Sequence, residues 1–275
     1  MTSPHRRAAV LGHPVSHSLS PALHRAAYRR LGLDWDYQAL DVTSEDLADF
    51  LSSLDSRWVG LSLTMPLKEA VLASLTSLDD QADRLGVVNT VLLGPGGARH
   101  GVNTDVTGLS HVLREAAVPS GVRATVLGGG ATARSTLAAL AAHQAAEVTV
   151  CLRRADVGSQ LVRLGADLGL QVRAHTFDEA PRDLATDLVV STVPSGAADG
   201  LAGSVPERPG TLVDVLYHPW PTRLAAAWAA AGGPVVGGLE LLVHQAAEQI
   251  ALMTGERVPP DVLRAAGSAA LADRA

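Results

Sequence analysis

The sequence contains a single cysteine, Cys151, among its 275 residues. A lone cysteine excludes a disulfide within the chain and any zinc or iron–sulfur site built from several cysteines. It fits a reducing compartment, and we expect Cys151 to be buried as a small apolar side chain. The composition therefore predicts a cytoplasmic protein without a metal site.

The chain also lacks an excess of basic residues and any long apolar run. Twenty-two Lys and Arg against 28 Asp and Glu give a formal charge of −6, so nucleic acid and anionic membranes are not expected partners. The N-terminal apolar run is too short for a signal peptide, and no later run approaches a membrane span. With 47% hydrophobic residues, we expect a soluble globular protein of one large or two medium domains.

Lysine, asparagine and isoleucine are almost absent. The sequence keeps only Lys68, Asn89, Asn103 and Ile250, beside many Ala, Arg, Gly and Leu, as is typical of a GC-rich genome. The survivors are candidates for chemistry that other residues cannot supply. Arginine carries charge but does not release a proton at working pH, whereas lysine can be tuned to do so. The alternative is that Lys68 is a chance surface lysine.

The apolar pattern alternates between short strands and amphipathic helices, which is typical of an α/β fold. In the first half, Gly-Pro-Gly-Gly at 94–97 predicts a hairpin between two short strands. The expected strands are 8–12, 35–40, 58–64, 88–93 and 99–104, and the expected helices are 21–32, 44–54, 65–75 and 106–117. After a break at 119–121, the expected strands are 124–130, 147–154, 170–174, 186–193 and 210–216, and the expected helices are 131–143, 235–255 and one from Pro260 that packs back onto the N-terminal domain.

A glycine-rich segment follows the apolar strand at 124–127. Gly128-Gly129-Gly130-Ala131-Thr132-Ala133 matches the G-x-G-x-x-A pattern between a strand and an Ala-rich helix. Glycines let the backbone approach a pyrophosphate, and the helix N-terminus offers N–H groups and positive potential. The alternative is a tight strand-to-helix turn that binds nothing.

The next strand ends in Leu152-Arg153-Arg154. An NAD enzyme usually has Asp or Glu here to bind the ribose hydroxyls, whereas two guanidinium groups suit the additional phosphate of NADP. The sequence therefore predicts NADP. The alternative is a solvated basic strand end.

A helix start near the N-terminus carries two serines. In His17-Ser18-Leu19-Ser20-Pro21, Ser20 suits the N-cap and Pro21 the first helical position. Ser18 and Ser20 would face the same way in an extended loop and could bind a small carboxylate. The simpler interpretation is a helix cap.

Taken together, these segments resemble the shikimate dehydrogenase family over nearly the whole chain. The segments are HSLSP at 17–21, SLTMPLK at 62–68, VNT at 88–90, VNTD at 102–105, the glycine loop, and GLELLVHQAA at 238–247. Their order is more specific than any one motif, and Lys68, Asn89 and Asn103 all fall inside them.

The resemblance implies reduction of 3-dehydroshikimate to shikimate with NADPH, on the way to chorismate and the aromatic amino acids. Lys68 matches the lysine that exchanges a proton with the C3 oxygen, and Asp105 matches its carboxylate partner. The substrate carboxylate would be held by Ser18, Ser20 and Tyr217, and the ring hydroxyls by Thr64, Asn89, Asp105 and Gln245. A polyhydroxylated acid needs such a set of hydroxyl and amide partners.

For the cofactor, the resemblance assigns the pyrophosphate to Gly128, Gly129, Gly130, Ala131, Thr132 and Ala133. It assigns backbone contacts near the nicotinamide to Val215 and Gly238, and phosphate binding to Arg153. Here the chain departs from the family's Asn-Arg-Thr motif: Leu152 and Arg154 replace Asn and Thr, and Val157 replaces a second arginine. Arg154 could substitute for that arginine.

The resulting prediction is an α/β protein of two domains with the active site in the cleft between them. Residues 1–105 plus 239–275 form the substrate-binding domain, and 106–238 a Rossmann-like NADP-binding domain, in a monomer or homodimer. Two alternatives remain open. One is an NAD-linked quinate/shikimate dehydrogenase, and the other is a dinucleotide-binding regulator without catalysis, which would have no need of Lys68 and Asp105.

Overall fold

The computed structural model describes residues 5–274, apart from the side chain of Ala155, and divides the chain into two compact units. The first unit ends at Thr107 and resumes at Leu242, and the second runs from Gly108 to Leu241. Both boundaries fall inside helices, α5 (Thr104–Glu115) and α10 (Gly238–Thr254). Because the interior of a helix has no turn residues, the sequence pattern places the domain boundaries only approximately, between residues 105 and 106 and between residues 238 and 239.

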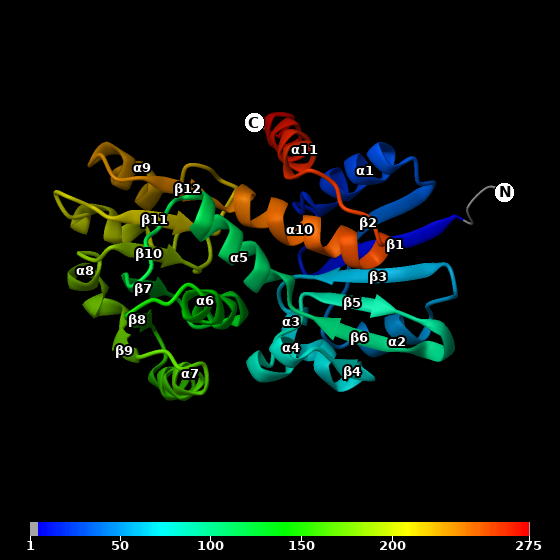
Figure 1. The fold of residues 1–275 in the computed structure, drawn as a ribbon, viewed down its shortest axis with the longest axis horizontal. Helices are drawn as coiled ribbons and strands as arrows, with labels where there is room; N and C mark the ends of the chain where they lie inside the picture. The colour runs from blue at the N-terminus through cyan, green and yellow to red at the C-terminus, as the bar shows by residue number, and fades with distance from the viewer. Residues whose placement is uncertain (1–4, 275) are drawn as a thin grey trace. The chain divides into compact units, whose positions relative to one another are not determined.

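The first unit contains a mixed six-stranded sheet in the order β2-β1-β3-β5-β6-β4 (Figure 1). β1 pairs in parallel with β2 and β3, whereas β5 is antiparallel to both β3 and β6. The β5–β6 hairpin predicted from the Gly-Pro-Gly-Gly turn is therefore confirmed. The strands are β1 (Arg6–Gly12), β2 (Trp35–Asp41), β3 (Trp58–Leu63), β4 (Ser77–Leu78), β5 (Thr90–Leu93) and β6 (Arg99–Val102).

Both faces of strand β1 are covered, and its residues 8–11 are all apolar. Ala9 and Leu11 pack in one buried cluster with residues of β3, and Ala8 and Val10 pack in another that includes Tyr37. A strand buried on both sides reads as a continuous apolar run, as residues 8–11 do.

The helices of the first unit flank this sheet (Figure 1). The C-terminal helix packs against α1, as predicted for the helix from Pro260. The helices in this part of the chain are α1 (Ser20–Leu31), α2 (Leu47–Ser52), α3 (Leu67–Ala70), α4 (Asp80–Leu85) and α11 (Pro260–Ala272), with 3-10 segments at Val71–Ser74 and Pro95–Gly97.

Two predicted helices of this unit are shorter than expected. The helix expected at 65–75 is α3 followed by a 3-10 segment, because the Lys68 carbonyl is also bound by the N–H of Val88 at 2.9 Å. The helix expected at 44–54 begins only at Leu47, since Thr43 and Asp46 form a side-chain hydrogen bond that closes a turn before it.

The second unit contains a fully parallel sheet in the order β12-β11-β10-β7-β8-β9. Counted from β7, this is the 3-2-1-4-5-6 order of dinucleotide-binding folds, so the predicted α/β fold with a Rossmann-like domain is confirmed. The strands are β7 (Arg123–Leu127), β8 (Glu147–Leu152), β9 (Val172–Thr176), β10 (Leu188–Ser191), β11 (Thr211–Asp214) and β12 (Val235–Gly237), and the helices are α6 (Ala131–Ala142), α7 (Ala155–Asp167), α8 (Ala180–Asp183) and α9 (Arg223–Ala230), with 3-10 segments at Phe177–Glu179 and Asp199–Ser204.

Strand β12 and the helices α7, α8 and α9 of this unit are not among the elements expected from the sequence. Residues 235–237, expected to begin a long helix, form β12, where the β-branched Val235 and Val236 pair with β11. Helix α7 contains Gly158 and Gly165, which are unfavourable inside a helix. A Cβ atom at these positions would lie 3.0 Å from Ala174 and 2.3 Å from Val172 of β9, so the glycines allow close packing of the helix on the strand.

Cys151 lies in β8 and is fully buried, as predicted, in a core cluster with Leu127 and Trp228. Burial raises the pKa of its thiol well above the ordinary range. Among the described residues, no helix is both long and apolar enough to cross a membrane.

One buried histidine gives the first unit a pH-dependent stability. His24 of α1 is fully buried, and its ring stacks on Tyr37 with centroids 3.9 Å apart. Desolvation lowers its pKa from 6.5 to about 3, against the opposing effect of a hydrogen bond to the amide oxygen of Gln249. The folded protein therefore holds His24 neutral at pH values where the unfolded chain protonates it.

Replacing His24 with Phe should flatten the pH dependence of the unfolding free energy. Below pH 6.5 the unfolded wild-type chain gains a proton that the folded chain does not take up, so stability falls as pH falls. Between pH 6.5 and 5 this contributes a loss of roughly 1.5 kcal/mol. Urea titrations at both pH values should show the loss in wild type and a correspondingly smaller loss in His24→Phe. Equal losses in the two proteins would contradict a neutral His24.

Candidate active site

Two Val-Asn-Thr segments form the polar centre of the first unit. They occupy 88–90 and 102–104, where β5 begins and β6 ends, and Thr90 pairs with Val102 in the hairpin. The side chain of Asn89 accepts a hydrogen bond from the N–H of Thr104 at 2.8 Å. The hairpin thus holds the amide of Asn89 at the start of α5.

Asp105 lies in the first turn of α5. Its N–H donates to Oδ1 of Asn103 at 3.1 Å, and Nδ2 of Asn103 donates to the carbonyl of Val87 at 3.1 Å. Asn103 thereby caps the helix and ties it to the segment before β5. The positive end of the helix dipole also favours a carboxylate at this position.

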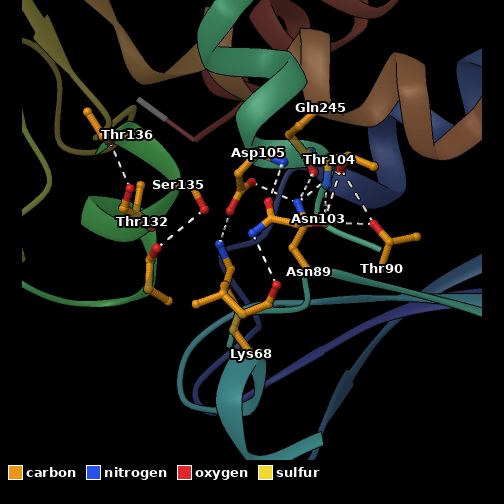
Figure 2. A network of polar contacts seen from close by, with 12 residues as sticks. Lys68, Asn89, Thr90, Asn103, Thr104, Asp105, Thr132, Ser135, Thr136 and Gln245 are labelled. Atoms are coloured by element: carbon orange, nitrogen blue, oxygen red, sulfur yellow. Dashed lines mark hydrogen bonds and ion pairs between the residues drawn. The ribbon is translucent and has the colours of Figure 1, made fainter. Parts of the chain in front are cut away.

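Lys68 contacts this carboxylate from a different element. Its neighbour Leu67 is fully buried and anchors α3, and Nζ of Lys68 lies 2.6 Å from Oδ2 of Asp105 (Figure 2). The Lys68 and Asp105 side chains are only 15% and 7% exposed. The predicted pair is therefore an ion pair largely removed from water, and the alternative of a chance surface lysine is wrong.

Asn89 contacts the other oxygen of Asp105. Its Nδ2 donates to Oδ1 of Asp105 at 2.7 Å, and Oε1 of Gln245 lies 3.4 Å from the same nitrogen. Asp105 thus accepts at both of its oxygens, from Lys68 and from Asn89. Lys68, Asn89, Asp105 and Gln245 thus form one connected polar cluster (Figure 2).

The remaining predicted residues of the first unit lie at the ends of β1 and β3. These adjacent strands are parallel, so Ser18 and Ser20 after β1 and Thr64 after β3 follow the same edge of the sheet. Ser20 is buried, and Ser18 and Thr64 are half-buried. Such an edge is where α/β sheets bind ligands.

The predicted helix cap differs in detail. Ser20 is the first residue of α1 rather than its N-cap, a position that Leu19 takes without a side-chain capping bond. Instead, Oγ of Ser18 accepts from the N–H of Ser20 at 3.3 Å. The loop expected to be extended turns instead, since the N–H of Ser18 donates to the carbonyl of Val15 at 2.9 Å and Leu19 has helical dihedral angles.

In the second unit, the loop from Gly128 to Ala133 has the shape that a pyrophosphate needs. Gly128 has φ of +108°, and a Cβ there would lie 2.6 Å from Oγ1 of Thr192. A Cβ on the exposed Gly130 would meet nothing within 4 Å, which leaves open space at the start of α6. Ala133 is buried, so its small side chain serves helix packing.

The first turn of α6 adds to this fit. It holds no acidic residue, and Gly130 before it has no side chain to bind the N–H groups. Ser135 and Thr136 donate to the carbonyls of Ala131 and Thr132, which leaves their hydroxyls turned back along the helix (Figure 2). A dinucleotide pyrophosphate therefore fits this helix start.

The two arginines after β8 are exposed. Nε of Arg154 lies 3.9 Å from Oδ1 of Asp156, and both side chains are more than 70% exposed. Val157, where the family has a second arginine, lies against the glycine loop, since a Cβ on Gly129 would be 2.9 Å from it. The side chain of Val157 thus supports the glycine loop by packing.

The segment after β11 holds the other predicted residues of the second unit. Val215 and Gly238 are adjacent, because a Cβ on Gly238 would lie 2.0 Å from the Val215 carbonyl oxygen. Half-buried Tyr217 lies in a loop held by the buried carboxylate of Asp214, which accepts from the N–H of Leu216 and the hydroxyl of Thr222. Desolvation raises the pKa of Asp214.

Comparison with known proteins identifies the family. Residues 10–91 match the model of the shikimate dehydrogenase substrate binding domain, and residues 238–266 match that of the shikimate 5'-dehydrogenase C-terminal domain. A shikimate dehydrogenase (NADP(+)) of Methanopyrus kandleri is 37% identical over 270 residues, which cover 94% of this chain and 93% of the relative. The chain belongs to the shikimate dehydrogenase family. The resemblance seen in the sequence is confirmed.

Solved structures of the same family share the fold. Mycobacterium tuberculosis shikimate dehydrogenase is 37% identical with a TM-score of 0.89, covering 96% of this chain and 99% of its own. Thermus thermophilus shikimate 5-dehydrogenase, solved in complex with NADP(H) and shikimate, is 36% identical with a TM-score of 0.84, covering 96% and 99%.

Some polar residues of the cluster were not singled out from the sequence. Thr104 lies in the second Val-Asn-Thr segment, Thr90 in the first, and Gln249 one helical turn after Gln245. The repeat of Val-Asn-Thr is the signal that could have identified the two threonines. For Gln249, the spacing of four from Gln245 places it on the same side of α10.

Proposed function

We propose that this chain catalyses the reversible reduction of 3-dehydroshikimate to shikimate with NADPH. The observation that carries the proposal is the ion pair of Lys68 and Asp105, with 2.6 Å between Nζ and Oδ2 in a nearly buried cluster. The relatives confirm the enzyme class and the cofactor expected from the sequence, since they are named NADP-dependent shikimate dehydrogenases. We further propose that the reaction serves chorismate and aromatic amino acid synthesis in the cytoplasm.

Lys68 exchanges the proton in this proposal. Its ammonium group gives a proton to the C3 oxygen as the carbonyl becomes an alcohol, and in the reverse direction Nζ takes the proton back. NADPH, when bound, supplies the hydride for C3. Asp105 holds the ammonium group of Lys68 towards the C3 oxygen and compensates its charge. Because the Lys68 side chain is 15% exposed, water can reprotonate Nζ.

The substrate contacts in the proposal follow the chemistry of each side chain. Asn89, Asp105, Gln245 and Thr64 hold the ring hydroxyls, because buried amides and carboxylates left without partners would disfavour a substrate that lacks those hydroxyls. Ser18, Ser20 and Tyr217 hold the substrate carboxylate through hydroxyl groups. This set selects a small polyhydroxylated acid.

The cofactor contacts lie in the second unit. The backbone of Gly128 to Ala133 would hold the pyrophosphate at the start of α6, and Val215 and Gly238 would offer backbone groups to the nicotinamide. Arg153 would bind the additional phosphate of NADP, with Arg154 as a second contact. The fit of the glycine loop supports this assignment. A monomer or homodimer stays our prediction for the assembly.

Replacement of Lys68 should abolish most of the turnover. Lys68→Ala should lower kcat by roughly 10²–10⁴-fold, the usual contribution of a general acid, with a smaller change in the KM for shikimate. Lys68→Arg should fail nearly as badly, since arginine does not release a proton at working pH. Steady-state reduction of NADP⁺ with shikimate measures both.

A matched control for that measurement is Arg57→Ala, which removes an exposed ion pair with Asp55 in the same unit and should keep kcat unchanged. An arginine at position 68 with near wild-type kcat would show that charge alone suffices and would remove the proton-transfer role. A wild-type chain that binds NADP and shikimate without turnover would favour the regulator.

Replacement of Arg153 should change the choice of cofactor. A charge-assisted contact to the phosphate contributes about 1.5–3 kcal/mol, so Arg153→Ala should raise the KM for NADP roughly ten- to a hundredfold while that for NAD changes little. Arg154→Ala should act in the same direction but more weakly, because Asp156 lies near its guanidinium. The ratio of kcat/KM for NADP over NAD is the quantity to measure.

Arg173→Ala is the control, because this arginine pairs with Glu147 on the neighbouring strand and should not affect the ratio. If wild type prefers NAD, or if Arg153→Ala and Arg154→Ala both leave the ratio of kcat/KM for NADP over NAD unchanged, the NAD-linked quinate/shikimate dehydrogenase becomes the better account. Parallel assays with quinate complete that comparison.

A further inference from the structure

The side chain of Gln249 in α10 has a partner for every donor and acceptor of its amide. Its Oε1 accepts from Oγ of Ser62 at 2.8 Å and lies 3.3 Å from Nε2 of His24. Its Nε2 donates to Oγ1 of Thr90 at 3.0 Å and to the carbonyl of Asn89 at 3.3 Å. The residue is 1% exposed, so this amide is held in one orientation without water.

The orientation is set from the side of Gln249 that faces α1 and β2. Burial lowers the pKa of His24, so its ring is neutral, and its Nε2 lies 3.3 Å from Oε1 of Gln249. The hydroxyl of Tyr37 donates to Ser62 at 2.6 Å, and Ser62 in turn donates to Oε1 of Gln249. The Ser62 hydroxyl therefore requires the oxygen of Gln249 on this side.

The nitrogen of Gln249 therefore faces the candidate active site. Because Thr90 accepts from Gln249, its own hydroxyl proton is directed to Oδ1 of Asn89, 2.9 Å away. With the N–H of Thr104 also donating to that oxygen, the amide of Asn89 cannot be reversed without losing both bonds. Nδ2 of Asn89 is consequently the atom that faces Asp105.

A reversed Asn89 would place an oxygen against Oδ1 of Asp105, where two acceptors repel each other. The carboxylate would then turn from the position in which Oδ2 meets Nζ of Lys68. The hydrogen bonds thus run without a break from Gln249 through Thr90 and Asn89 to the ion pair, all within the first unit.

We propose that Gln249 is a positioning residue for the reaction: acting through Thr90, it fixes which end of the Asn89 amide faces Asp105 and thereby aims Lys68 at the substrate oxygen. The proposal rests on the proposed function, because its kinetic consequence needs Lys68 to transfer a proton.

The direct test replaces Gln249 with Met, which is of similar length and makes no such hydrogen bonds. Gln249→Met should lower kcat for shikimate oxidation roughly 10- to 100-fold, the range expected when a reacting group is displaced by about an ångström. The KM for NADP should stay within about twofold, because the cofactor loop belongs to the other unit. A loss of stability alone would leave kcat unchanged at temperatures far below the melting point.

Two further variants separate positioning from folding. Thr90→Val keeps the shape of the side chain but removes the relay, so it should lower kcat to a similar extent, and combining it with Gln249→Met should add little. Thr254→Val removes a hydrogen bond to the carbonyl of Ile250 in the same helix, which does not lead towards Asn89, and should keep kcat near wild type. Independent, multiplicative losses for Gln249 and Thr90 would overturn the relay.

A readout that does not depend on turnover uses the single lysine of the chain. With ¹³C-labelled lysine, the ε-methylene resonance reports Lys68 alone. It should move in Gln249→Met and in Thr90→Val but not in Thr254→Val. An unmoved resonance in the first two overturns the positioning role, whereas a wild-type chain inactive towards shikimate contradicts the proposed function without affecting this test.

Discussion

The ion pair between Lys68 and Asp105 is the interaction on which the polar interior of the first unit depends. Removing two charges from water costs several kcal/mol per ion, and a buried pair compensates this only with good geometry and further hydrogen bonds. Here the 2.6 Å contact and the bond from Asn89 supply them. Since well-packed apolar residues would often be as stable, the pair is best explained by the proton transfer that we propose for it.

In the proposed function, the two units would bind their ligands by opposite means. In the first, a fixed set of side chains is oriented by a hydrogen-bonded network in which each amide has one allowed direction. In the second, the glycine loop depends on missing side chains, because a Cβ on Gly128 would meet Thr192 and the space at Gly130 stays open. A polyhydroxylated substrate needs many directed partners, whereas a pyrophosphate needs backbone N–H groups at close range.

Much of this arrangement could be predicted from the sequence, because its signals are local. The apolar run at 8–11, the Gly-Pro-Gly-Gly turn and the glycine loop each specify a nearby element, and scarcity drew attention to Lys68 and Asn89. The relay through Thr90 and Gln249 could not be predicted, because it joins residues 159 positions apart that only the packing of α10 against the sheet brings together. The prediction that Ser20 caps α1 was wrong. The backbone already has helical dihedral angles at Leu19, and no residue type in the sequence indicates this.

The helix that was expected at 235–255 shows the same limit on a larger scale. Val235 to Gly237 continue smoothly into the apolar pattern of α10, yet pairing with β11 takes them into the sheet. Tertiary pairing overrides a local pattern wherever an open strand edge is available. The pattern of apolar residues alone does not show which strand edges are open for pairing.

The most direct test of the account is a crystal structure of the protein with shikimate bound. The account predicts a ring oxygen within about 2.6–3.2 Å of Nζ of Lys68, with Asp105 and Asn89 on the neighbouring hydroxyls and the Asn89 amide in the orientation described above. Shikimate bound away from Lys68, or bound there with the ion pair to Asp105 broken and Nζ turned from the ring, would contradict it.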